Sequence, residues 1–432
     1  MFMAKNASHQ SRDQAGSSRF FWGSSARLRR WCLLIGLSLV VGVVGWWGWQ
    51  NGCATFFRQG CLRAQADGDW EATEQQALLW ASYAPGSAAP FVYAAEAALA
   101  RQAMPRAAAY LDLVPNDDPA AVPALLERVD MLFADLADPL AAEQTCRRIL
   151  SIDPTTGGAH QRLTFFYAVT LQRTLLAKQA RQAIQQGCEL PEAYVYLVAA
   201  DWITLSNIVR VNQPWQARWP DEELFLVAIA RGEVSARGQD LLLENDEAAA
   251  AGEHAKALEP IATMRTLRKR FPGNLELLAF ALERAITAGD QEAVATLLAA
   301  VPKSGTQDNR FWRFKGWLHG VRQELDEAYQ AFHQALSLNP FDFLTRHYLA
   351  DVARKRGETE AASQLAVLAR TGRQLRRTIM EQPEVRSMSL PVMQEIAEYI
   401  DACGEPTIAE RLYSRIEQMK LLQPAPEIVD PL

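Results

Sequence analysis

Three of the six histidines recur at a fixed spacing, and imidazole is the commonest metal ligand in proteins. His319, His333 and His347 are each fourteen residues apart. A metal site needs ligands that converge on one point, but turns and a proline separate the segments that carry these histidines. The sequence therefore predicts no metal-ligating residues.

The six cysteines form neither a redox motif nor a paired zinc site, because no C-x-x-C occurs. Cys53 and Cys61 flank a short segment that would lie in an oxidising compartment if the preceding apolar stretch spans a membrane. A local disulfide and two free thiols are both open for this pair. Cys146 is expected to pack as a small apolar side chain.

Signatures of common enzyme classes are absent from the sequence. It has no P-loop, no dinucleotide-binding glycine motif after a strand, no H-E-x-x-H and no G-x-S-x-G. We therefore expect neither an enzyme nor a cofactor, and we name no catalytic or cofactor-binding residue.

Composition and charge point to a helical, acidic body. Alanine and leucine dominate the 432 residues, and the net charge is -6. Residues 1–30 hold six cations and one anion, which leaves -11 on the remainder. An acidic body without a basic stripe is a poor partner for phosphates, so no nucleic-acid binding is predicted.

One apolar segment is unlike any part of an ordinary soluble domain. Residues 31–49 contain no charge, and as a helix they would span roughly 30 Å, the hydrocarbon thickness of a bilayer. Tryptophans cluster at the end of the segment, and Arg27, Arg29 and Arg30 precede it. The positive-inside rule then keeps residues 1–30 in the cytoplasm. These residues are rich in serine, glutamine and arginine and are expected to form a disordered tail. The sequence predicts a single-pass protein of the cytoplasmic (inner) membrane with its body outside the cytoplasm.

Cleavage of this segment as a secretory signal is the competing interpretation. Gly52 and Ala54 could satisfy the small-residue spacing of a cleavage site, but a secretory signal has a shorter apolar core. A retained anchor is favoured for that reason. Ser38 and Gly42 stand four apart and could let two such helices approach closely, so a homodimer stays open.

Prolines close helical segments at a regular spacing after the anchor. Pro85, Pro119 and Pro154 are 34 and 35 residues apart, and Pro272 and Pro340 are 68 apart. A period near 34 is that of the tetratricopeptide repeat, a helix–turn–helix unit. The chain resembles this family.

The clearest unit runs over residues 309–342. Lys315 and His319 depart from the family's pattern, because Leu and Tyr are usual there. The resemblance implies an all-α fold, a tetratricopeptide-type helical-hairpin solenoid that follows one N-terminal transmembrane helix. Six positions match the pattern: Trp312, Gly316, Ala328, Phe332, Ala335 and Pro340.

The repeat loses its phase in the middle of the chain, where Pro214 and Pro220 interrupt the helical pattern. A short linker is expected over 376–389, and the proline-rich end is expected to be unstructured. The predicted organisation is a tail (1–30), a transmembrane helix (31–49), an N-terminal array (55–200), a divergent helical segment with a loop (201–260), a second array (261–375) and a C-terminal helical hairpin (390–420).

Solenoids of this kind bind extended peptides or partner helices on an inner face formed by the first helix of each pair. That face is predicted to carry Arg313, Trp317, His347, Asp351 and Arg354. Arginine beside tryptophan is typical of binding hot spots, although residues of this kind can also be merely solvated or packed. The lysine–asparagine pair with which some family members hold a partner's C-terminal carboxylate is absent.

Three functions from different classes follow from this sequence. The favoured one is a membrane-anchored scaffold or adaptor that binds protein or peptide partners, in envelope assembly or secretion. Its layout is similar to that of certain bacterial one-span tetratricopeptide proteins that attend the secretion translocon. The alternative is an oligomeric assembly factor without a peptide client. An enzyme with its site in 201–260 is the least favoured.

Overall fold

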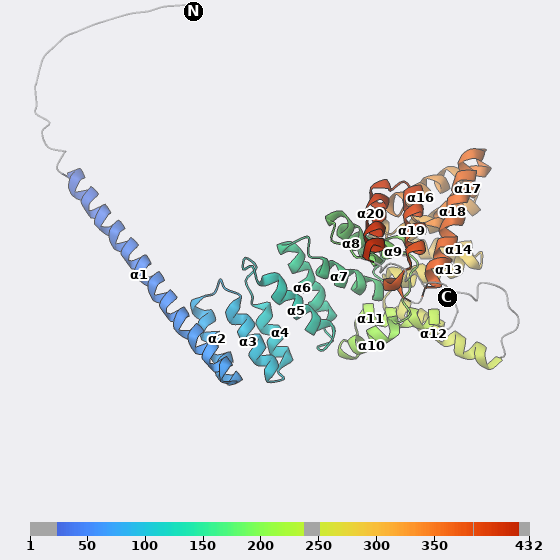
Figure 1. Cartoon of the computed structure of the whole chain (residues 1–432). Helices are drawn as coiled ribbons and strands as arrows, with labels where there is room; N and C mark the ends of the chain where they lie inside the picture. Colours follow the sequence, from blue (N-terminus) through green and yellow to red (C-terminus); the bar gives the residue numbers. More distant parts are fainter. Residues whose placement is uncertain (1–23, 237–250, 383, 423–432) are drawn as a thin grey trace, which may run out of the picture. The chain divides into compact units, whose positions relative to one another are not determined.

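The computed structural model of the chain describes residues 24–236, 251–382 and 384–422. Every regular element in these residues is helical, with twenty α-helices, two short 3-10 helices and no strand (Figure 1). The predicted all-α class is therefore confirmed. Most of the tail predicted over 1–30, part of the loop predicted within 201–260 and the proline-rich end lie outside the described residues.

The first of two compact units ends at Arg101. Its first helix, α1, is unbroken, and its last turns pack on α2. Residues Leu33–Ala66 are the one stretch of the described chain that is long and apolar enough to cross a membrane, and its most apolar part is entirely unburied. The unit contains α1 (Ser24–Ala66), α2 (Trp70–Tyr83) and α3 (Ala89–Ala100).

Cys61 is buried where α1 meets α2, and its thiol donates a hydrogen bond to the backbone oxygen of Thr73, 3.8 Å from Sγ. Cys53 lies eight residues earlier on the same helix, roughly 12 Å away along the axis. That separation is too large for a disulfide, and both thiols are free. Of the two alternatives for this pair, the structure therefore has the free thiols.

The second unit runs from Gln102 and consists of helical pairs. It begins with α4 (Met104–Asp112), α5 (Ala121–Phe133), α6 (Pro139–Ile152), α7 (Gly157–Val169), α8 (Arg173–Gln186), α9 (Glu192–Val198), α10 (Ile208–Arg218), α11 (Glu223–Ala236) and α12 (Ala251–Arg270). It continues with α13 (Leu275–Thr287), α14 (Gln291–Ala299), η1 (Lys303–Gln307), α15 (Asn309–Val321), α16 (Leu325–Leu338), α17 (Phe343–Lys355), α18 (Thr359–Met380), η2 (Val385–Ser387), α19 (Leu390–Ala402) and α20 (Pro406–Leu422).

A turn with one left-handed residue recurs between the helices of a pair. The spacing of these residues is 34 or 35 in each of two runs, which confirms the predicted repeat. Glycine adopts this conformation freely, whereas other residues reach it only at a cost. The first run consists of Gly68, Gln102, Ala137 and Leu171, and the second of Gly289, Gln323 and Gly357; Gly187 and Gly404 also have positive φ but lie outside this spacing.

The unit predicted over residues 309–342 has the helix boundaries expected of it. Asp308 caps α15 and Asp342 caps α17, each by accepting a hydrogen bond from a backbone amide in the first turn. A Cβ at Gly316 would lie 2.6 Å from the ring of Phe332, so the close crossing of α15 and α16 requires glycine here. Ala328 is fully buried at the same crossing.

The middle of the chain keeps helical pairs in spite of its lost phase. α10 and α11 form a hairpin, although Pro214 lies inside α10. α18 continues to Met380, so the second array extends beyond the predicted end at residue 375.

The last hairpin returns to the first array and packs against α8 and α9 (Figure 1). Arg411 donates to the backbone oxygen of Ile184 at 2.6 Å, and Arg415 donates to that of Glu189 at 3.1 Å. Residues more than two hundred positions apart are thereby joined. The second unit thus closes on itself instead of ending as a free stack.

We predict that Gly289→Ala lowers the free energy of unfolding by about 1–2 kcal/mol, because φ is +69° at this turn. No atom lies within 4 Å of a Cβ built there, so the loss would be purely conformational. Gly273→Ala is the matched control: it has the same open surroundings without a positive φ, and it should not destabilise. Equal urea midpoints for both variants would contradict the left-handed turn.

Candidate functional site

One groove of about 700 Å³ brings together four of the five residues predicted for the partner-binding face. Its walls come from α15, α17 and α18. Trp317 lies on α15, and His347, Asp351 and Arg354 lie on α17. We call this hollow the α17 groove.

The three α17 residues share one face of the helix because they are spaced at i, i+4 and i+7. The start of α17 is fixed by Asp342, whose carboxylate accepts a hydrogen bond from the backbone amide of Thr345 at 3.0 Å. This cap sets where the helix begins, and the spacing then aims the three side chains into the same groove.

The floor of the α17 groove is apolar. The ring of Tyr348 stacks on that of Phe332 with 6.0 Å between centroids, and Val352 is buried beside them. Ala366 and Ala369 of α18 complete the floor with small side chains, which leaves depth for a ligand group. The hollow can therefore accept an apolar side chain from a partner.

The second helix of the pair contributes residues that sequence reasoning missed. Arg370 and Arg373 of α18 line the groove and are exposed. They were missed because the inner face was assigned to the first helix of each pair alone. Their i, i+3 spacing, which places two arginines on one side of a long helix, is the signal that could have found them.

Asp351 is the only carboxylate among the residues that line the groove. It pairs with Arg354 and with Lys355, both at 3.1 Å and both at the surface. Partial burial and the positive charge of Arg373 lower the pKa of His347, so its ring is neutral at pH 7. The groove therefore carries a net positive charge.

Arg313, the fifth predicted residue, does not line the groove. Its side chain is 4% exposed, and its guanidinium donates to Asp342 at 2.5 Å and to Asp201 at 3.2 Å. Arg313 was assigned to the partner-binding face because it precedes Trp317 by one helical turn. Its two carboxylate partners, one of them 112 residues away, hold it in the interior instead.

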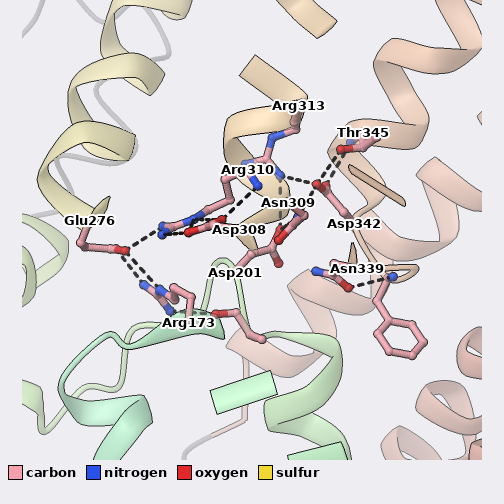
Figure 2. A network of polar contacts seen from close by, with 12 residues as sticks. Arg173, Asp201, Glu276, Asp308, Asn309, Arg310, Arg313, Asn339, Asp342 and Thr345 are labelled. Atoms are coloured by element: carbon pink, nitrogen blue, oxygen red, sulfur yellow. Dashed lines mark hydrogen bonds and ion pairs between the residues drawn. The ribbon is translucent and has the colours of Figure 1, made fainter. Parts of the chain in front are cut away.

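A buried ion cluster extends from Arg313 to α8 and α13 (Figure 2). Glu276 of α13 accepts hydrogen bonds from Arg173 of α8 at 3.1 Å and from Arg310 of α15 at 2.7 Å. Arg310 also donates to Asp308 at 2.8 Å. Each of these side chains is less than a tenth exposed.

Ionisation within the cluster is uneven. Burial opposes the charge on Glu276, but Arg173 and Arg310 outweigh it and hold the pKa of Glu276 well below its usual range. Burial and the neighbouring charge of Asp342 raise the pKa of Asp201 instead. Oδ1 of Asp201 is also buried without a hydrogen-bond partner.

The three regularly spaced histidines lie on separate helices. His319 of α15 contacts the carboxylate of Glu324 at 2.5 Å, and His333 of α16 packs on Tyr329 with 4.3 Å between ring centroids. Only His347 faces the groove. Among the described residues, no three histidine, cysteine, aspartate or glutamate side chains gather closely enough to hold a metal ion.

No family model and no curated protein matches the sequence. Solved structures with some likeness include yeast Tom70 (12% identity, 87% of this chain and 78% of that chain, TM-score 0.26). Two others are the APC/C hetero-tetramer Cut9–Hcn1 (11%, 86% and 80%, TM-score 0.33) and the human IFIT1 dimer with m7Gppp-AAAA (11%, 83% and 75%, TM-score 0.29). The fold is therefore assigned from the paired helices of this chain and from their recurring turn.

The fold is of the tetratricopeptide type. Antiparallel helical pairs with a turn every 34 or 35 residues define it, and the crossing of Gly316 with Phe332 has the close packing that this repeat needs. In this tetratricopeptide-type solenoid the α17 groove lies on two successive repeats.

We predict that Glu276→Gln lowers the free energy of unfolding by about 3 kcal/mol at pH 7, because it leaves two buried arginines without their shared anion. Asp351→Asn, the control, removes only exposed ion pairs and should change stability by less than about 1 kcal/mol. Urea unfolding of the full chain in detergent would measure both.

The effect should also depend on pH with a definite sign. The pKa of Glu276 is depressed by folding, so its contribution is fully present above the ordinary value of 4.5 and is lost as the pH falls further. The stability gap between wild type and Glu276→Gln should therefore be the same at pH 7 and pH 6. A gap that closes already between these values would contradict the ion cluster.

Proposed function

We propose that this protein is a membrane-anchored scaffold that binds a segment of a partner protein in the α17 groove. The observation that carries the proposal is the groove itself, an open hollow of about 700 Å³ with an apolar floor and a polar rim. Trp317 and Arg354 at its edge are residue types that dominate binding energy at protein interfaces. No catalytic step is proposed.

Retention of the anchor is supported by aromatic contacts that cross the candidate cleavage point at Gly52 and Ala54. Tyr83 of α2 contacts Trp49 at 5.7 Å before that point and Phe57 at 5.4 Å after it, measured between ring centroids. Cleavage would remove one half of this cluster and cut α1 inside a continuous helix. We infer that α1 stays whole.

The proposed topology places the N-terminus in the cytoplasm and the helical body outside the cytoplasmic membrane. It is supported by the exposed apolar face of α1 and by Arg27, Arg29 and Arg30 just before the apolar stretch. Partners would then be components of the cell envelope or of secretion.

We predict that protease added to intact spheroplasts digests a tag at the C-terminus and spares a tag at the N-terminus. The physical reason is that the positive charges before the span are retained on the cytoplasmic side. Blots against both tags, with detergent-opened spheroplasts as the control, would measure this. A protected C-terminal tag would reverse the orientation, and an N-terminal tag found apart from the body without protease would mean cleavage.

We predict that filling the groove weakens peptide binding. Short peptides of random sequence, displayed on phage, would be selected on the full chain in detergent. Ala366→Trp would place an indole on the groove floor and should weaken the selected peptides by at least about tenfold.

Ala361→Trp is the matched control, because Ala361 lies exposed on the same helix and outside the groove. Both variants should keep the wild-type circular dichroism spectrum. If no peptide is enriched over empty micelles and only self-association of the chain appears, the assembly-factor alternative replaces the scaffold.

A further inference from the structure

The charges around the α17 groove are unbalanced. Four cationic side chains line it, on α17 and on α18, against the single carboxylate of Asp351. The chain beyond residue 30 carries a negative net charge. A local excess of positive charge on an otherwise negative protein is a specific feature of this surface, because the average charge would predict the opposite sign.

Asp351 can neutralise only part of this charge. Arg354 and Lys355 share it, and both remain substantially exposed, at 61% and 41%. Arg370 and Arg373 have no carboxylate of the described residues within ion-pair distance, and both are exposed. Two arginines one turn apart on α18 therefore face the groove without an anion.

The neighbourhood of His347 is consistent with this excess. Burial lowers the pKa of His347, and the positive charge of Arg373 lowers it further. A histidine that is kept neutral in this way adds no further cation, and it can pack against an apolar group. Its ring lies 5.6 Å from that of Tyr348.

We propose that the α17 groove selects an acidic segment of a partner protein. Carboxylates of the segment would meet Arg370 and Arg373 on α18, while an apolar or aromatic side chain between them packs on Trp317 and Tyr348. Guanidinium groups suit this role, because they bind carboxylates through two parallel hydrogen bonds. The inference depends on the proposed function, since it names the chemistry of the partner at the same groove.

A protein segment is favoured over a nucleic acid by the shape and charge of the surroundings. The four cations of this hollow of about 700 Å³ share it with the carboxylate of Asp351 and with the apolar side chains of Trp317, Tyr348 and Val352. A carboxylate among the cations repels phosphates, whereas the apolar surface offers a contact to a peptide side chain. An oligonucleotide is therefore included in the test as a competing outcome.

The test compares three pools of random short peptides in which every second residue is glutamate, glutamine or lysine. Each pool is passed over the immobilised full chain in an uncharged detergent, beside a single-stranded oligonucleotide. The glutamate pool should be retained about tenfold more than the glutamine pool, as two to three exposed ion pairs would give. The preference should weaken when salt rises from ~0.1 M to ~1 M, because the screening length falls to about 3 Å.

Charge reversal makes the expected result specific to the two arginines. The double variant Arg370→Glu with Arg373→Glu should lose the glutamate pool and gain the lysine pool. The control, Arg265→Glu with Lys269→Glu, changes the net charge equally on exposed residues of α12 and should behave as wild type. Unchanged thermal melts would establish that both variants are folded.

The remaining outcomes distinguish the acidic preference from peptide binding in general. If Ala366→Trp blocks binding but all pools bind equally, the groove binds peptides and the acidic preference is wrong. If the oligonucleotide is retained better than the glutamate pool, the partner is a nucleic acid. If no pool binds the wild type above empty micelles, both the acidic preference and the proposed function fail.

Discussion

Glu276 accepts hydrogen bonds from two buried arginines that lie 103 and 34 residues away in the chain, Arg173 and Arg310. A single ion at this depth would destabilise the fold by several kcal/mol, so the charges are tolerable only when all partners are in place together. The cluster therefore requires α8, α13 and α15 to assemble at once. A simple solenoid needs only contacts between neighbouring repeats, and this body goes beyond that rule.

The same cluster orients the helices of the groove. Asp342 caps α17 and also accepts from Arg313 of α15, so one carboxylate sets the start of the first helix and the rotation of the second. Trp317 follows Arg313 by one turn, and the groove face of α17 begins at His347, a few residues after the cap. A partner would meet walls that are already positioned, which reduces the entropy lost on binding.

The long apolar stretch is joined to the first repeat by the same helix. α1 passes from its apolar part into its contact with α2 without a break, and Tyr83 holds the junction through rings on both sides of it. An unbroken helix fixes the direction of the apolar stretch relative to the first hairpin, whereas a flexible linker would not.

The sequence by itself determined the all-α class, the repeat of 34 to 35 residues and the long apolar stretch, because helical periodicity, turn chemistry and hydrophobic length are local properties. The small residue at Gly316 belongs to the same local pattern, but the structure decided that the ring of Phe332 packs on it. Only the tertiary structure decided that Arg313 is buried and that the last hairpin returns to α8 and α9. Those outcomes depend on partners far away in the chain, 112 residues for Asp201 and Arg313, and contacts across such distances leave no period in a sequence.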